Sequence, residues 1–125
     1  MLIGFIIMVV IIVLIVKLSY VEKQNIELLS EKCRNEVYEE YKKKSTKFLR
    51  NELFEISEEY HRKLDYYKKR FREDYGSECV TPFGFDNEKC ENGARGYMRY
   101  DKDDMRLFHT YQVISEILDR RNKGD

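Results

Sequence analysis

The sequence predicts an all-α protein made of a membrane-spanning helix and a helical body, and three observations lead to this fold class. The first residues form an apolar run that is almost free of charge, as a membrane-spanning helix requires. Residues 26–75 contain neither proline nor glycine and carry apolar side chains at helical spacing. Residues 101–122 show the same spacing after a stretch that is rich in glycine.

These observations divide the chain into four predicted segments. Residues 1–21 are a transmembrane anchor, residues 22–75 a long charged amphipathic helix of coiled-coil type, residues 76–100 a loop with glycine and proline, and residues 101–122 a shorter C-terminal helix. Each of the two amphipathic helices has an apolar face that is not stable alone in water. We therefore expect the last helix to pack back on the long helix as an antiparallel hairpin.

The anchor is predicted from the stretch MLIGFIIMVVIIVLIVKLSYV, in which Lys17 is the one charged side chain. A helix of 21 residues spans roughly 31 Å, close to the hydrocarbon thickness of a bilayer. A cleaved signal peptide would need a positively charged start and a small-x-small cleavage site, but Lys17 stands two residues before Ser19, where a small residue is required. The sequence therefore predicts an uncleaved anchor whose partner is the lipid bilayer.

The orientation of the body is predicted from the positive residues that flank the anchor. No lysine or arginine precedes the apolar run, whereas Lys17, Lys23, Lys32 and Arg34 follow it. Because positive residues are retained on the cytoplasmic side, we expect a single-pass protein with a cytoplasmic body. The alternative places the body outside the cytosol, as a structural or accessory subunit of a phage, cell-surface or organellar membrane complex.

The long helix has two apolar stripes with helical spacing. The first consists of Ile26, Leu29, Cys33, Val37 and Tyr41. The second consists of Leu53, Ile56, Tyr60, Leu64, Tyr67, Phe71 and Tyr75. Between them Ser45 occupies an apolar position and the stripe shifts phase, which fits a bend, a local opening or a break between two helices.

The predicted loop begins at Gly76, which follows Tyr75 where a helix-closing glycine belongs. The predicted C-terminal helix starts at Asp101 as N-cap, and its apolar face consists of Leu107, Tyr111, Ile114 and Leu118. This face is expected to pack against the second stripe, from Leu53 to Tyr75. The four residues of this face and the second stripe as far as Phe71 form the predicted interaction stripe, through which a protein partner or a second copy of the chain would bind.

The cysteines allow two interpretations that depend on the compartment. Cys79 and Cys90 lie in the predicted loop, and Cys33 lies on the first stripe. In a reducing cytoplasm we expect Cys79 and Cys90 to be reduced, whereas outside the cytosol they are a possible disulfide. Cys33 is expected to be a packing residue in the first case and a site for an interchain bridge in the second.

No pattern in the sequence predicts catalysis or ligand binding. The spacing of Cys79 and Cys90 lacks the CxxC pair of a zinc site, and no nucleophile motif surrounds either thiol. The 23 lysine and arginine residues balance the 23 aspartate and glutamate residues, so the chain has no net field that attracts nucleic acid. We expect no catalytic residues, no cofactor, no metal ion, no small-molecule substrate and no nucleic acid.

The order of segments, an apolar span followed directly by a charged helix, resembles the layout of several bacterial membrane-tethered coiled-coil proteins. The resemblance covers the layout and no specific motif. The expected function is that of a single-pass, membrane-tethered helical scaffold or interaction subunit that is not an enzyme. The alternative is an extracytoplasmic structural subunit with a disulfide between Cys79 and Cys90.

Overall fold

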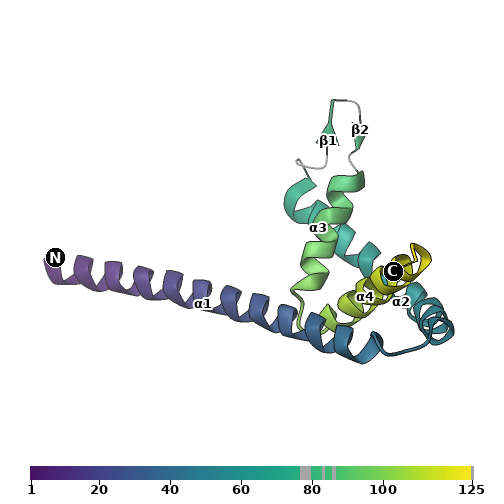
Figure 1. Ribbon diagram of the computed structural model, residues 1–125. Helices are drawn as coiled ribbons and strands as arrows, with labels where there is room; N and C mark the ends of the chain where they lie inside the picture. Colours follow the sequence, from purple (N-terminus) through teal and green to yellow (C-terminus); the bar gives the residue numbers. More distant parts are fainter. Residues whose placement is uncertain (77–79, 83, 86, 125) are drawn as a thin grey trace.

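A computed structural model describes the chain apart from residues 77–79, 83, 86 and 125 (Figure 1). In chain order the elements are α1 (Leu2–Tyr41), α2 (Thr46–Tyr75), β1 (Val80–Thr81), β2 (Gly84–Phe85), α3 (Asn87–Arg99) and α4 (Met105–Asn122). The two short strands pair antiparallel as a hairpin. The predicted helical fold class is confirmed, and the strand hairpin is an addition that the sequence analysis did not anticipate.

Helix α1 has two halves with different surroundings. Every residue from Met1 to Asn25 is exposed, whereas Ser30, Val37 and Tyr41 are buried against the rest of the chain. In Figure 1 the first half extends away from the body as a free rod, and the second half runs past α4 toward α2. One continuous helix therefore belongs to the body at one end only.

The long helix predicted for residues 22–75 is interrupted at residues 42–45, so that part of the prediction is wrong. Ser45 has an extended backbone, with φ −66° and ψ 155°, and its Oγ accepts a hydrogen bond of 3.1 Å from the backbone N–H of Phe48. This is the geometry of a helix N-cap. Of the three interpretations of the phase shift at Ser45, the break between two helices is the correct one.

Arg121, in the last turn of α4, stabilises the break between α1 and α2 through hydrogen bonds. Its guanidinium donates hydrogen bonds to the carbonyl oxygens of Lys42 at 3.2 Å and Lys44 at 2.9 Å, and to Oγ1 of Thr46 at 3.1 Å. Carbonyls near the end of a helix lack partners within that helix. A side chain that is far away in the sequence therefore fixes how α1 turns into α2.

The predicted loop of residues 76–100 is wrong for residues 87–99, which form helix α3 and pack along α2. Gly93 and Gly96 suggested a loop because glycine costs a helix about 1 kcal/mol relative to alanine. A Cβ atom at Gly93 would overlap the ring of Phe71 on α2. Gly93 is thus required for the close approach of two helices, and this tertiary contact outweighs its low helix propensity.

Substitutions of the two α3 glycines are expected to have opposite effects on stability. Gly93→Ala forces the Phe71 ring out of its place, and such overpacking costs about 1–3 kcal/mol against a helix-propensity gain of about 1 kcal/mol. Gly96→Ala, which meets no atom within 4 Å, should be stabilising by up to about 1 kcal/mol. Urea unfolding of both variants checks this, and equal effects at the two positions would show that α3 does not pack on Phe71.

The core has two clusters that lie along α4. The first joins α1, α2 and α4 and consists of Val37, Tyr41, Leu49, Val113, Ile114 and Ile117. The second joins α2, α3 and α4 and consists of Tyr60, Leu64, Tyr67, Ala94, Met98 and Phe108. Helices α2 and α4 both contribute to the two clusters, so the body is assembled around this pair of helices.

Three contacts give the relative direction of α2 and α4. Thr46 contacts Arg121, Tyr60 accepts a hydrogen bond of 3.2 Å from Gln112, and Tyr67 donates one of 2.6 Å to Asp104. Residue numbers rise along α2 as they fall along α4, so the two helices are antiparallel. The predicted hairpin pairing of these segments is confirmed, although α3 lies between them in the sequence and covers the second half of α2.

Candidate functional site

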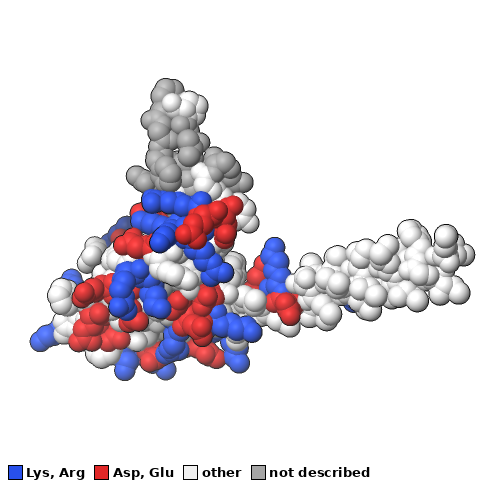
Figure 2. Space-filling view, turned by 180° about the vertical axis from the view of Figure 1, so that it is seen from behind, with Lys and Arg blue, Asp and Glu red and all other residues white. Residues whose placement is uncertain are grey.

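The most distinctive surface is the exposed apolar half of α1. Leucine, isoleucine, phenylalanine and valine fill every position from 2 to 16 except Gly4 and Met8. A window of this helix has a mean hydropathy of 3.0 and is 0% buried, and no other helix in the described part of the chain is long and apolar enough to cross a membrane. Figure 2 shows the rod as mostly uncharged, whereas charged side chains of both signs cover the body.

Two other kinds of helix pass the same test of length and composition: the core helix of a soluble protein and a signal sequence. The core helix of a soluble protein is mostly buried, which the 0% burial of this segment excludes. A signal sequence lies near the N-terminus, as this segment does. The segment is therefore compatible with a membrane span or with a signal sequence.

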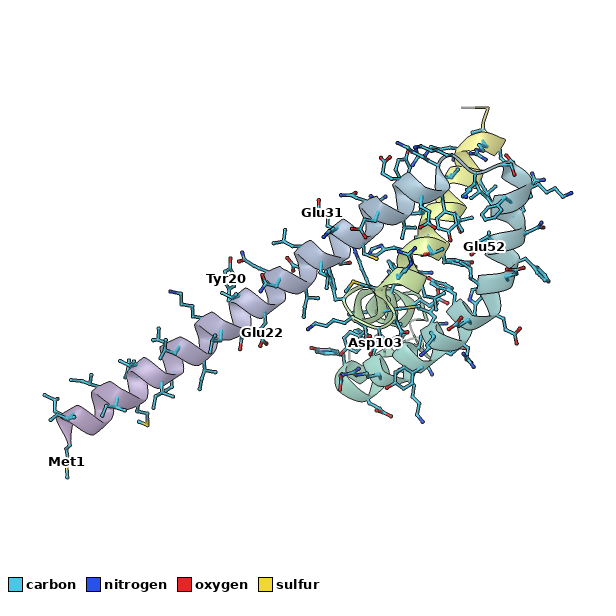
Figure 3. The ribbon with its side chains drawn as sticks, turned by 90° about the horizontal axis from the view of Figure 1, so that it is seen from below. Met1, Tyr20, Glu22, Glu31, Glu52 and Asp103 are labelled. Carbon is cyan, nitrogen blue, oxygen red and sulfur yellow. The ribbon has the colours of Figure 1, made fainter. Side chains whose placement is uncertain are left out.

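Two open grooves lie where α1 leaves the body. Ile26 of α1 lines both grooves, and the turn between α3 and α4 contributes Lys102 to the first and Tyr100 to the second. Glu22 lines both grooves and in Figure 3 lies on the side of α1 nearer the body. Polar side chains line both grooves: Glu22, Asn25 and Lys102 in the first, and Ser19, Glu22, Lys23 and Glu27 in the second.

A buried polar joint fastens α1 to the body just beyond these grooves. Ser30 Oγ donates a hydrogen bond of 2.9 Å to the carbonyl oxygen of Arg99 and lies 2.7 Å from Nε2 of His109. The serine hydroxyl has one proton, which goes to the carbonyl, so His109 donates from Nε2 to Ser30. One serine thus ties α1 to the end of α3 and to α4.

A serine within hydrogen-bond reach of a histidine is also the pairing of a nucleophile with its base. Here both side chains are only 1% exposed, and neither lines the grooves described above. The serine proton is already directed at a backbone carbonyl. A substrate has no route to this pair, and its role in the structure is to connect three helices.

Burial, together with the positive charges of Arg99 and Arg34, lowers the pKa of His109 to about 4. The imidazole is therefore neutral at pH 7, which agrees with a ring that donates one hydrogen bond from inside the core. In the unfolded chain a histidine has a pKa of about 6.5. The folded body consequently resists protonation of this residue.

The stability of the body should fall between pH 6.5 and pH 4 because of His109. Its folded pKa is depressed, so the unfolded chain binds the extra proton first and stability is fully present only above about pH 6.5. A shift of this size corresponds to about 3 kcal/mol. Urea unfolding from pH 7.5 to pH 4 should show a weaker pH dependence for His109→Gln and an unchanged one for the exposed control His61→Gln. Parallel pH profiles of wild type and His109→Gln would contradict the assignment.

The predicted interaction stripe is occupied by packing within the chain. Its buried members are Tyr60, Leu64, Tyr67 and Ile114, and its partly buried members are Leu53, Ile56, Phe71, Leu107, Tyr111 and Leu118. The Tyr60 and Tyr111 rings, for example, are stacked with centroids 3.8 Å apart. Tyr67 is buried against Asp104, and burial is the main cause of its raised pKa. The two faces of the stripe therefore pack against each other within one chain.

The cysteines differ in chemical state. Cys90, on α3, is fully buried and disulfide-bonded, so the expectation of a reduced thiol at this position is wrong. That expectation came from the predicted compartment and not from local geometry. Cys79 lies outside the described residues. Cys33 is free and half-buried, and burial raises the pKa of its thiol, which agrees with the packing role predicted for it.

Within the described residues, no three side chains of histidine, cysteine, aspartate or glutamate gather where they could hold a metal ion. No protein-family model matches the chain, and neither a curated protein nor a solved structure matches it. The site from which function can be argued is therefore the apolar half of α1 and its joint with the body.

Proposed function

We propose that the protein is a single-pass membrane-tethered helical interaction subunit without catalytic activity. The observation that carries this proposal is the continuity of α1, which runs from Leu2 to Tyr41 with its first half fully exposed and apolar. Val37 and Tyr41, in the second half, belong to the core of the body. A helix of this kind holds a folded body at a defined distance from the bilayer.

The composition of the exposed half supports insertion into lipid. Each leucine, isoleucine, phenylalanine or valine near the middle of a span favours insertion by about 0.3–0.6 kcal/mol. These residues fill nearly all positions from 2 to 16, so their sum amounts to several kcal/mol. In water the same side chains would form an apolar patch far larger than soluble proteins tolerate.

The continuity of α1 also favours an anchor over a cleaved signal sequence. Cleavage near Ser19 would fall inside a helix that continues without interruption to the core residue Tyr41. Lys17 also occupies the position where a small residue would be needed. Lysine at that place suits a span, because its long side chain can reach the headgroup region.

Alkaline carbonate extraction combined with intact-mass measurement tests the anchor. The wild-type chain should stay in the membrane pellet with its first residue retained. The double variant Val9→Lys/Val13→Lys places two charges near the middle of the span, each costing about 2.5–3.5 kcal/mol, and should move to the soluble fraction. Phe54→Lys, at a position on α2 that is 85% exposed, is the control that should leave retention unchanged. A soluble wild type, or a chain that begins near residue 20, would refute the anchor.

A second candidate places the body outside the cytosol, as a structural or accessory subunit. The disulfide at Cys90 favours this orientation, because such bonds persist in oxidising compartments. The positive residues after the span favour the cytoplasmic orientation. An impermeant thiol reagent applied to intact cells distinguishes them. With Phe54→Cys in a Cys33→Ser background, the cysteine introduced at a position that is 85% exposed should react before lysis if the body is outside, and only after lysis if it is cytoplasmic.

A further inference from the structure

We propose that two copies of the chain pair in parallel along one face of α1, through an outer seam made of Leu18, Val21, Asn25 and Leu28. This inference rests on the proposed membrane anchor, because the bilayer supplies both the direction and the proximity of the two helices. The seam replaces the interaction stripe, whose residues are used within the chain. Its occupant is a second copy of this protein.

Leu18, Val21 and Leu28 lie on the side of α1 that faces away from the body, and Asn25 lies at the edge of the groove that Lys102 also lines. The body-facing side is marked by Ser30 and Val37, which are buried, and a helix turns by about 100° per residue. Leu28 is nine residues before Val37 and so lies about half a turn around the helix from it. Leu18, Val21 and Leu28 are 64%, 43% and 63% exposed. In Figure 3 Glu31, which flanks the seam, lies on the side of α1 away from the body.

The spacing of the seam is that of a coiled coil. Leu18, Val21, Asn25 and Leu28 are separated by 3, 4 and 3 residues, so Leu18 and Asn25 take the a positions and Val21 and Leu28 the d positions. The body-facing residues of the same helix belong to a different face. Leu18 and Val21 belong to the last turn of the predicted anchor, Asn25 and Leu28 lie beyond it, and none of the four is buried in the fold of one chain.

Asn25 indicates which kind of assembly the seam fits. A single asparagine at an a position lowers the stability of a coiled coil but selects two parallel strands in one register, because the two amides hydrogen-bond to each other. Two copies anchored in the same membrane point in the same direction, so a parallel pairing is the one that the bilayer allows. In that pairing Asn25 of one copy meets the Asn25 of its partner copy.

The charges beside the seam are complementary in this arrangement. Lys17 occupies a g position and Glu22 an e position, and in a parallel pair the g residue of one helix lies beside the next e residue of the other. Lys17 of each copy therefore faces Glu22 of the other. Lys32 takes the following a position, so the apolar seam ends at Leu28. Its short length makes the pairing dependent on the local concentration that a shared membrane provides.

Oxidative cross-linking in lipid vesicles tests the seam with the full-length chain in a Cys33→Ser background. Cysteine at d positions of paired helices comes close enough to form a disulfide. Val21→Cys and Leu28→Cys should cross-link at least ten times faster than the controls Lys23→Cys and Glu27→Cys, which are exposed on other faces of α1. Equal rates at all four positions would mean random collision and would overturn the proposal.

Carbonate extraction of the same samples separates this inference from the anchor on which it rests. Asn25→Asp places two negative charges against each other in the seam, so cross-linking through Leu28→Cys should drop at least tenfold while membrane retention stays unchanged. Retention without cross-linking in the Leu28→Cys chain would overturn the pairing and leave the anchor standing. Loss of that chain from the membrane pellet would overturn both.

Discussion

Replacing Ile114 with alanine should lower the free energy of unfolding of the body by about 2–5 kcal/mol. Ile114 is 0% exposed and lies in the cluster where α1, α2 and α4 meet. The substitution leaves a cavity that rigid helices from three directions cannot close. Since a small domain is stable by only about 5–15 kcal/mol, this loss is a large share of the total.

The measurement is urea unfolding of a fragment of residues 22–125. Residues 1–21 are fully exposed in the structure, so their removal deletes no packing partner of the body. Phe54→Ala is the matched control, because Phe54 is 85% exposed and its loss should change stability by less than about 0.5 kcal/mol. An Ile114→Ala fragment that unfolds at the wild-type urea concentration would show that α4 does not pack between α1 and α2.

Replacing Cys90 with serine should cost a similar amount, about 2–5 kcal/mol, which is typical for the loss of a native disulfide. Cys90 is disulfide-bonded and fully buried on α3, so the substitution removes a cross-link and places a hydroxyl in the core. A thiol reductant should destabilise the wild-type chain by a comparable amount and have no further effect on Cys90→Ser. The measurement is thermal unfolding of both chains with and without reductant.

Cys33→Ser is the control for this experiment. Cys33 carries a free thiol, so its variant should keep the full response to reductant. If reductant leaves the wild-type melting temperature unchanged, the disulfide does not stabilise the body.

The helical class and the pairing of α2 with α4 could be predicted because both depend on local periodicity. Leu64 and Ile114 repeat within their own segments at the spacing of one helix face, and burial follows from that spacing. The break at Ser45 was detectable in the same way. Its residue type, a favoured helix N-cap, would have distinguished a break from a bend.

Helix α3 could not be predicted, because Gly93 makes room for the ring of Phe71, a residue that is distant in the sequence. Local propensity assigns such a residue to a loop, and only the packed structure shows why a side chain is excluded there. The seam on α1, by contrast, can be recognised in the sequence from its heptad spacing. Its assignment to a second copy of the chain also requires the structure, which shows which face of α1 the body covers.

The joint between Ser30 and His109 was missed for a similar reason. Ser30 lies among the apolar residues that face the body, and a small polar residue in such a position indicates a buried hydrogen bond. The sequence does not reveal that its partners are Arg99 and His109, which belong to segments almost seventy residues or more away. Long-range polar pairs of this kind emerge only when the helices are placed relative to one another.

The central claim, that the first half of α1 crosses a bilayer, is tested most directly by thiol accessibility in sealed lipid vesicles. Single cysteines replace Ile11 or Lys23 in a Cys33→Ser background, and a water-soluble maleimide is added before and after the vesicles are opened. The account predicts that Lys23→Cys reacts in full once the vesicles are opened and the maleimide reaches both faces of the bilayer. Ile11→Cys should stay unreactive in opened vesicles and react only after detergent dissolves the bilayer. Reaction of Ile11→Cys in intact vesicles would show that this segment lies in water and would contradict the claim.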